Sequence, residues 1–301
     1  MIKKETKVGL NLLFCDNQDE LKDSKLDDVD IIYLKNKPNN MEDYFYVPLK
    51  ITYKFDVPET EEEYTTLLSK NKRKKIKKSL RKVKEEGISF VFDFPIKKNN
   101  FLEWLAIYNK NIDAKEKSML FVNGDWYEKN KKKRGGIFAK KDNRIIGGII
   151  FKSMHKGDYF DERWSIAFSS TKREFLILGV NELLNYHLIM FARENGIRLL
   201  VRGMDTNLYG YHLSPGLYLF KKSVGFKVIP YKKKGFYYMK INSFKKFKNE
   251  ILFFSLGDNG LLVGNIMARK KIENIQEFDG DFLSKLKQYE IKSNNSFKRA
   301  D

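Results

Sequence analysis

The stretch Leu199–Lys227, LLVRGMDTNLYGYHLSPGLYLFKKSVGFK, predicts a strand, a loop, a short helix and a second strand in close succession. The apolar run Leu199–Val201 is short and predicts a buried strand that begins near Ile197. We expect the strand to end at Arg202–Asp205, where a loop rich in turn-forming residues and tyrosines begins. In a parallel sheet such a loop lies at the carboxyl end of the strand, where ligands bind.

The second half of this stretch has clear helix signals. Ser214 can cap the free backbone donors of a helix, and Pro215 suits its first turn. Gly225 is placed to end the helix, and Phe226–Ile229 then predicts the next strand.

The segment Phe220–Phe226, FKKSVGF, resembles the end of the GNAT acyltransferase fold, in which a helix with a Phe-Lys pair leads into a Gly-Phe strand. The pattern is most similar to that of the Fem-type branch, the tandem-GNAT aminoacyl and acyl transferases. The simpler interpretation is that Phe220, Gly225 and Phe226 only pack the helix against the strand.

A second notable stretch is Ser69–Lys84, SKNKRKKIKKSLRKVK, which follows a capping-box pattern at Thr60 and Glu63. From Lys70 to Lys84 it has ten basic residues and no acidic one, and three apolar residues form a narrow helical seam. This helix could bind tRNA or another phosphate backbone, lie on an anionic membrane, or only be a solvated surface. Fem-type proteins carry a similar Lys/Arg-rich helix before a glycine and a strand. The resemblance therefore implies a phosphate or nucleic-acid site at Lys72, Arg73, Lys74, Lys77 and Lys78.

The middle of the chain predicts a β-hairpin, 135–140 and 144–151, with Asp142-Asn143 in its turn, and a long helix, 180–194. In GNAT proteins the loop before the corresponding helix holds the pyrophosphate of coenzyme A. The resemblance implies that role for Lys172, Arg173, Leu178, Gly179 and Val180. The family motif has two small residues where this chain has Gly179 alone, which puts coenzyme A in doubt. Both acyl-CoA and aminoacyl-tRNA therefore remain open as co-substrates, and we expect no tightly bound cofactor.

Acyl transfer to an amine needs a base, an acid for the leaving group and donors for the oxyanion. Asp205 could act as the base or orient the amine, Tyr209 or Tyr211 could protonate the leaving group, and Lys221 could stabilise negative charge. Ser214 and His212 are further polar candidates in the same stretch. The alternative for each is a structural role, in which Asp205 caps the loop and the tyrosines pack.

Composition restricts the remaining choices. The chain has 301 residues with 42% hydrophobic content, enough for two modest domains, and its net charge of +19 favours a polyanionic partner or reflects a lysine-rich composition. The single cysteine, Cys15, excludes an intramolecular disulfide. The three histidines have no metal-site spacing, so we expect no metal. Because neither a signal peptide nor a membrane span is evident, we expect a cytoplasmic protein.

Together these patterns predict an α/β protein of two GNAT-like halves, with mixed central sheets flanked by helices. We expect a first half at residues 1–95, a second half with the active site at 96–240, and C-terminal strands at 241–301 that return to the first half. The expected function is an N-acyltransferase that moves an acyl or aminoacyl group from acyl-CoA or aminoacyl-tRNA to an amine. The alternative is a non-catalytic nucleic-acid-binding protein on a degenerate GNAT scaffold. The acceptor and the oligomeric state are left open.

Overall fold

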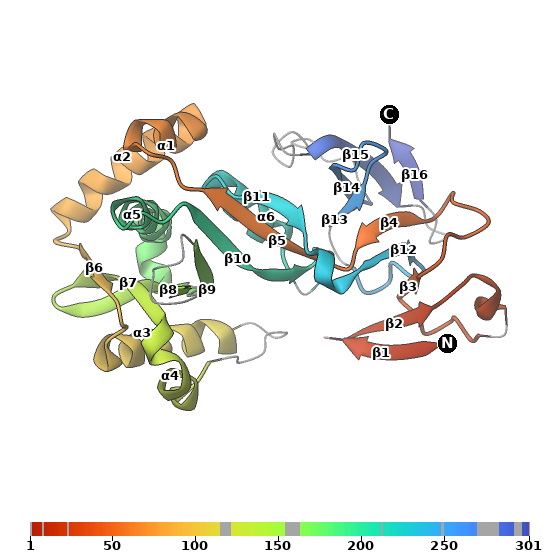
Figure 1. Cartoon of the computed structure of the whole chain (residues 1–301), viewed down its shortest axis with the longest axis horizontal. Coiled ribbons are helices and arrows are strands. Elements are labelled where there is room, and N and C mark those ends of the chain that lie inside the picture. Colours follow the sequence, from red (N-terminus) through yellow and green to blue (C-terminus); the bar gives the residue numbers. More distant parts are fainter. Residues whose placement is uncertain are drawn as a thin grey trace. The chain divides into compact units, whose positions relative to one another are not determined.

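The protein is a mixed α/β structure, as its sequence predicts, and its chain divides into two compact units that are described separately (Figure 1). Unit 1 comprises residues 1–52, 204–222 and 228–301, and unit 2 comprises residues 53–203 and 223–227. The computed structural model describes residues 2–7, 9–22, 24–114, 122–153, 163–211, 213–247, 250–269, 283–291 and 297–300.

Unit 1 contains a five-stranded sheet with the order β1-β2-β3-β12-β4. Strand β12, between β3 and β4, comes from far along the chain. It pairs antiparallel with both neighbours, so that Tyr238 lies opposite Leu34 on one side and Tyr46 on the other. The strands are β1 (Lys3–Lys7), β2 (Leu10–Cys15), β3 (Ile31–Leu34), β4 (Phe45–Pro48) and β12 (Phe236–Ile241).

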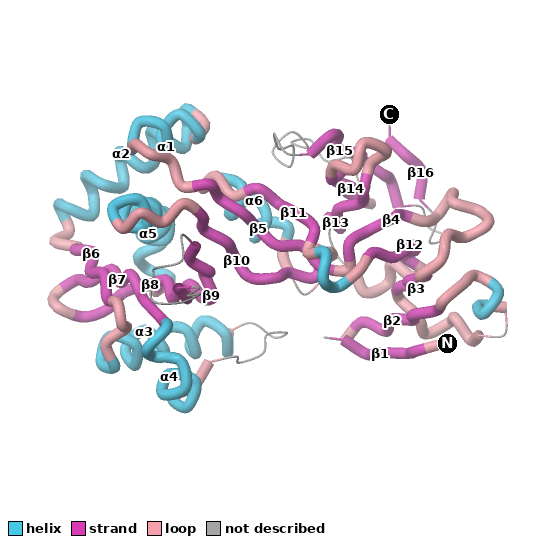
Figure 2. Tube along the Cα trace, in the orientation of Figure 1, coloured by secondary structure: helices cyan, strands magenta, loops and turns pink. Residues whose placement is uncertain are grey.

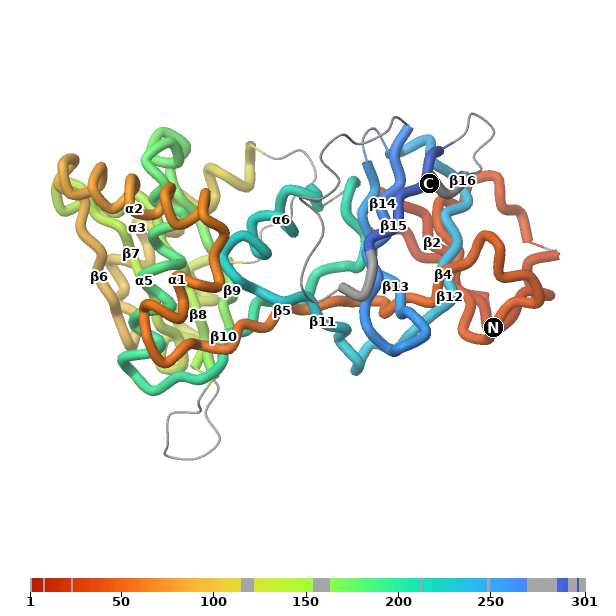
Figure 3. The backbone as a smooth tube through the Cα atoms, turned by 90° about the horizontal axis from the view of Figure 1, so that it is seen from above, coloured from red at the N-terminus to blue at the C-terminus, as the bar shows by residue number. Residues whose placement is uncertain are grey.

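The C-terminal strands of unit 1 form a second sheet with the order β13-β14-β15-β16. Strand β13 contacts β4 of the first sheet (Figure 3). Apolar side chains from both sheets share one core, which includes Ile31 and Met239 from the first sheet and Phe253 and Met267 from the second. The strands are β13 (Ile251–Leu256), β14 (Leu262–Ala268), β15 (Leu283–Ile291) and β16 (Phe297–Ala300).

Unit 2 is organised by a sheet in which β6, β7, β8 and β9 pair antiparallel and β10 is parallel to β9. The complete seven-stranded order is β11-β5-β10-β9-β8-β7-β6. The chain passes from one unit to the other within β5, within β10, at the end of α6 and within β11. The strands are β5 (Lys50–Asp56), β6 (Ser89–Asp93), β7 (Arg134–Lys141), β8 (Arg144–Ser153), β9 (Arg163–Thr171), β10 (Leu199–Thr206) and β11 (Lys227–Pro230).

Helices α3 and α5 lie on opposite sides of strands β7 to β9 (Figure 1). Trp104 of α3 is fully buried there, and its indole nitrogen donates to the carbonyl of Gly148 on β8 at 3.1 Å. Unit 1 consists mainly of strands (Figure 2). Its longest described helical segment is the part of α6 up to Lys222. The α-helices are α1 (Glu61–Leu67), α2 (Lys70–Glu85), α3 (Lys98–Asp113), α4 (Gly124–Asn130), α5 (Val180–Glu194) and α6 (Pro215–Ser223), and none of those described is long and apolar enough to cross a membrane.

Several local predictions are confirmed. Thr60 caps its helix as predicted, since its hydroxyl accepts from the Glu63 amide at 3.1 Å, while the Glu63 carboxylate accepts from the amide of Glu59, one residue before the cap, at 2.9 Å. The predicted hairpin is β7–β8, and Asp142 and Asn143 in its turn both have positive φ angles. The long helix runs over the predicted residues, Val180–Glu194.

The strand expected to end over Arg202–Asp205 is slightly longer in the structure. Strand β10 continues to Thr206, so Asp205 is its second-to-last residue. The domain boundaries expected at residues 95 and 240 stay a prediction, and the first division between the compact units lies at Thr52–Tyr53. Long-range strand pairing contributes to that division: β12 completes the sheet of β3 and β4, which no local pattern records.

Candidate active site

In unit 1, Asp205 brings together two of the candidate residues from the sequence. One oxygen of its carboxylate, Oδ2, accepts hydrogen bonds from the ammonium of Lys221 and from the hydroxyl of Tyr209, the latter at 2.8 Å. Asp205 lies near the end of β10 and Lys221 lies in the last turn of α6. The strand end and the helix thus place an ammonium and a phenol within hydrogen-bonding distance of the same carboxylate oxygen.

The Asp205–Lys221 ion pair is largely removed from water. The side chain of Lys221 is 7% exposed and that of Asp205 is 13% exposed. Tyr218 precedes Lys221 by one helical turn, and the rings of Tyr209 and Tyr218 both pack on Phe254, so an aromatic cluster adjoins the hydroxyl that binds Asp205. Charges interact more strongly in such an environment than in bulk water, which suits a site that must stabilise a developing charge.

The segment after Asp205 is fixed to β13 by its backbone. The backbone amide of Tyr209 donates to the carbonyl of Leu252 at 2.8 Å, and the Tyr209 carbonyl accepts from the Leu252 amide at 3.1 Å. Gly210 is required next to this bridge, because its φ is +109° and an added Cβ would lie 2.3 Å from the carbonyl oxygen of Glu250. The position of the Tyr209 hydroxyl therefore depends on a strand near the C-terminus.

Lys50, which the sequence patterns did not single out, lies in the electrostatic surroundings of Asp205. Burial lowers the pKa of the Lys50 ammonium, the charges of Lys7 and Lys234 lower it further, and Asp205 acts in the opposite direction. A backbone hydrogen bond holds the Lys232–Lys234 turn close to Lys50, because the Lys50 carbonyl accepts from the amide of Tyr231 at 2.9 Å. A lysine at the start of β5 has no local sequence signal that would have indicated this environment.

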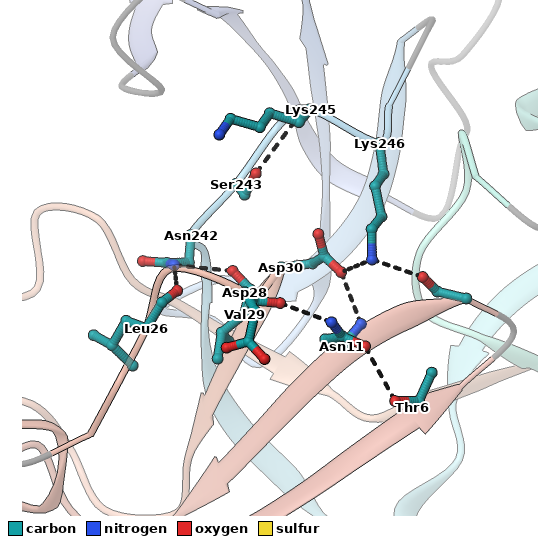
Figure 4. A network of polar contacts seen from close by, with 11 residues as sticks. Thr6, Asn11, Leu26, Asp28, Val29, Asp30, Asn242, Ser243, Lys245 and Lys246 are labelled. Carbon is teal, nitrogen blue, oxygen red and sulfur yellow. Dashed lines mark hydrogen bonds and ion pairs between the residues drawn. The ribbon is translucent and has the colours of Figure 1, made fainter.

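Tyr211 contacts a different part of unit 1. An added Cβ on Gly9 would lie 2.7 Å from the Tyr211 hydroxyl, and the Tyr211 ring packs edge-on against Phe247 at 5.8 Å. The Gly9 turn is itself held by Lys246, which donates to the Gly9 carbonyl at 2.8 Å and to the buried carboxylate of Asp30 at 2.7 Å (Figure 4). The contacts described for Tyr211 thus place it against the β1–β2 turn.

The remaining candidates of this stretch have other positions. Ser214 is exposed, and its hydroxyl accepts from the Gly216 amide at 3.1 Å, which makes it a cap of α6. His212 lies outside the described residues. Ser214 therefore has a structural role that its helix-start pattern already predicts, while its proposed catalytic role stays a prediction.

The candidates for a pyrophosphate site lie in unit 2, at the start of α5. Gly179 has a φ of +78°, and an added Cβ would lie 2.2 Å from the hydroxyl oxygen of Ser79 on α2. Val180 is buried, whereas Arg173 is exposed on the preceding 3-10 helix, Arg173–Leu178. Lys172 and Leu178, at the two ends of that segment, are half-buried. The five residues are therefore close in sequence, and α2 packs directly against the glycine among them.

A carboxylate of the chain occupies the first turn of α5. Glu182 forms ion pairs with Lys72 at 3.7 Å and with Lys75, both on α2. Burial alone would raise the pKa of Glu182, but the hydrogen bond from Lys75 and the charges of Lys72 and Lys75 outweigh burial and hold that pKa below its ordinary value. Glu182 thus places its own negative charge where the helix dipole favours an anion.

Helix α2 divides its basic residues between two faces. Lys72 faces inward, with an 11% exposed side chain, and burial lowers its pKa more than Glu182 raises it. The other four residues predicted to bind phosphate are exposed: Arg73, Lys74, Lys77 and Lys78. Lys72 therefore differs from the other four, because its ammonium forms an ion pair with Glu182 within unit 2.

The catalytic candidates belong to unit 1, and the candidates for the pyrophosphate and nucleic-acid sites belong to unit 2. Besides Lys50, local patterns missed Glu182, which the predicted helix start at Val180 could have indicated as a first-turn acid. Within the described part of the chain, no group of three or more His, Cys, Asp or Glu side chains is arranged to hold a metal ion.

The sequence matches no protein-family model and no curated protein. Among solved structures, FemX matches with 12% identity and a TM-score of 0.48 over 79% of this chain and 82% of its own. The C-terminal domain of a putative lysylphosphatidylglycerol synthetase from Agrobacterium fabrum matches with 11% identity and a TM-score of 0.42, over 80% of each chain. An aminoglycoside acetyltransferase from an uncultured soil metagenomic sample matches with 12% identity and a TM-score of 0.38, over 48% of this chain and 90% of its own.

Proposed function

We propose that the protein is an N-acyltransferase that moves an acyl or aminoacyl group from an activated donor to an amine. The observation that carries this proposal is the shared Asp205 oxygen, which joins the ammonium of Lys221 and the hydroxyl of Tyr209 in a largely buried site. These three groups supply the proton acceptor, the oxyanion donor and the proton donor that acyl transfer requires.

The reaction begins when the acceptor amine attacks the carbonyl carbon of the donor and forms a tetrahedral intermediate. Lys221 donates a hydrogen bond to the oxyanion of that intermediate, and Asp205 takes the proton that the positively charged nitrogen must lose. The bond to the leaving group then breaks, and the Tyr209 hydroxyl gives its proton to the leaving thiolate or ribose oxygen. Asp205 returns its proton to Tyr209 through their hydrogen bond, which restores the starting state.

For the donor, we favour aminoacyl-tRNA over acyl-CoA. Glu182 neutralises the start of α5 and Ser79 packs against Gly179, so a pyrophosphate at that position would meet a carboxylate and a closely packed helix. The exposed basic residues of α2 supply the charge that an RNA backbone attracts, namely Arg73, Lys74, Lys77 and Lys78.

The second candidate function is non-catalytic binding of nucleic acid, and the basic outer face of α2 favours it. The two functions differ in what the Asp205 pair does. An enzyme requires Asp205 and Lys221 for turnover. A binding protein requires only the exposed charges of α2, so folded variants of the pair should keep their affinity for nucleic acid.

The test measures deacylation of acetyl-CoA and of aminoacyl-tRNA in separate reactions, each with lysine, a lysine-containing tripeptide or an amino sugar as the acceptor. We expect the wild-type protein to accelerate deacylation of the tRNA, and Lys221→Met to lower the rate by roughly 100-fold or more, as for loss of an oxyanion donor. Deacylation of acetyl-CoA alone would reverse the choice of donor. Equal rates for wild type and Lys221→Met with both donors would overturn the enzymatic proposal and favour the binding protein.

A further inference from the structure

Asn207 is a buried amide between the two residues that share the candidate site, Asp205 and Tyr209. It is 4% exposed, and both of its side-chain polar atoms have backbone partners on strands β4 and β13. The side-chain nitrogen donates to the carbonyl of Pro48 at 2.9 Å and to that of Phe254 at 2.6 Å, and the side-chain oxygen accepts from the Phe254 amide at 2.8 Å. One side chain thus fastens this segment to β4 and β13 at once.

We infer that Asn207 is a positioning residue, which sets the register of the Asp205–Tyr209 segment on β13 and so holds the Tyr209 hydroxyl on the Asp205 carboxylate. That this positioning serves catalysis rests on the proposed function. That Asn207 sets the register of the segment can be tested without any substrate. The Tyr209–Leu252 backbone bridge lies two residues from Asn207 on one strand and two residues from Phe254 on the other, so both anchors specify the same alignment.

The chemistry of the position requires an amide. Two carbonyl oxygens, those of Pro48 and Phe254, need donors, and the Phe254 amide needs an acceptor on the same side chain. A carboxylate would supply the acceptor but would direct negative charge at both carbonyls, and an aliphatic side chain would leave three buried backbone groups unpaired. Ionisation of a carboxyl group here would therefore release the segment, and its protonation would restore one donor.

Asn265 is a matched control in the same unit. It is 1% exposed on β14, and its side-chain nitrogen donates to the Ser255 hydroxyl at 2.8 Å and to the Val263 carbonyl at 3.1 Å. Its described partners lie on β13, β14 and β15 and do not include the Asp205–Tyr209 segment. The proposed positioning amide, Asn207, can thus be compared with a structural amide, Asn265, that is similarly buried.

The experiment compares Asn207→Asp with Asn265→Asp by NMR of the full chain, and it needs no substrate. The readouts are the side-chain ammonium signal of Lys221 and the hydrogen exchange of the Tyr209 and Leu252 amides. We expect Asn207→Asp at neutral pH to shift the Lys221 signal and to accelerate exchange at both amides by at least about tenfold, as local opening does. Lowering the pH should partly reverse both effects, and Asn265→Asp should leave the Lys221 signal unchanged.

An unchanged Lys221 signal in folded Asn207→Asp, or equal shifts in both variants, would overturn the inference. If Asn207→Asp does not fold, Asn207→Ser replaces it, because its hydroxyl keeps one donor, and the same two readouts apply. The result is separate from the fate of the proposed function. If Lys221→Met leaves deacylation unaltered, the enzymatic proposal fails, even when Asn207 positions the segment. If the Lys221 signal is unchanged in Asn207→Asp, only the inference about Asn207 fails.

Discussion

Lys221 and Asp205 lie 16 residues apart in the sequence and form an ion pair in which both side chains are largely hidden from water. Removing one partner of a buried pair leaves an unpaired charge in a dry environment, which costs about 3–5 kcal/mol. The pair is therefore important for folding as well as for the proposed chemistry, and loss of activity in a single variant needs a measurement of stability beside it.

We first predict the outcome of a double-mutant cycle at this pair. Asp205→Asn and Lys221→Met should each lower the free energy of unfolding by about 3 kcal/mol, because each strands the opposite charge. The double variant should be more stable than the sum of the single effects predicts, while remaining inactive. Urea unfolding monitored by circular dichroism measures the three variants. Additive losses would show that the two groups do not interact in solution.

The second prediction concerns Glu182 and pH. Its pKa is lower in the folded protein than in the unfolded chain, so the α2–α5 ion pairs stabilise the fold above the ordinary glutamate pKa of about 4.3. This contribution is lost as the pH falls through the lowered folded pKa. Glu182→Gln should therefore reduce stability at pH 7 and lessen its decline in acid, as thermal unfolding at several pH values would show. An unchanged pH dependence would contradict the pairing.

The third prediction separates the two faces of α2. The combined variant Arg73→Gln, Lys74→Gln, Lys77→Gln and Lys78→Gln should weaken binding of single-stranded RNA and reduce the slope of log affinity against log salt by about 0.7 for each lost phosphate contact. Lys72→Gln should instead destabilise the fold, because Lys72 pairs with Glu182. Fluorescence anisotropy at several salt concentrations measures the slope.

The control for this prediction removes four exposed lysines elsewhere in unit 2 and so matches the change of charge: Lys110, Lys129, Lys132 and Lys133. If this control weakens RNA binding as much as the α2 variant does, the effect is one of net charge and the outer face of α2 is not a specific surface.

The fourth prediction concerns the ionisation of Lys50. Burial, Lys7 and Lys234 lower its pKa, and Asp205 raises it. NMR titration should therefore show Lys50 losing its proton at a lower pH than the ordinary lysine pKa. Lys234→Gln should move the Lys50 midpoint up, and Asp205→Asn should move it down. Shifts of the same sign in both variants would contradict the described arrangement of charges.

Local chemistry made many elements readable in the sequence. The Asp142-Asn143 turn between two apolar runs predicted the β7–β8 hairpin, since both residues accept positive φ angles in a tight turn. The Thr60 hydroxyl accepts from the Glu63 amide, as the predicted cap requires, and the Ser69 hydroxyl accepts from the Lys72 amide at the start of α2. The Phe-Lys-Lys-Ser-Val-Gly-Phe motif placed Lys221 on a helix before a strand, and it lies there in the structure.

The ion pair of Lys221 with Asp205 was only partly foreseeable. Both residues were candidates because of their positions in the motif and at the strand end, but their direct contact depends on how α6 packs beside β10. The positions of Tyr211, against Gly9, and of Lys50, near Lys234, depend in the same way on which distant strands pair.

The sequence by itself determined the mixed α/β class, the helices and hairpins, and the stretch that holds the candidate site, because these depend on side-chain periodicity and on backbone preferences within a few residues. Only the tertiary structure decided that β12 lies between β3 and β4, that Glu182 pairs with Lys72 and Lys75, and that Asn207 fastens the Asp205 segment to β4 and β13. The partners of Asn207 lie 47 and 159 positions away in the sequence, and Glu182 and Lys75 are 107 apart. Hydrogen bonds and burial at that range leave no periodic pattern in the sequence.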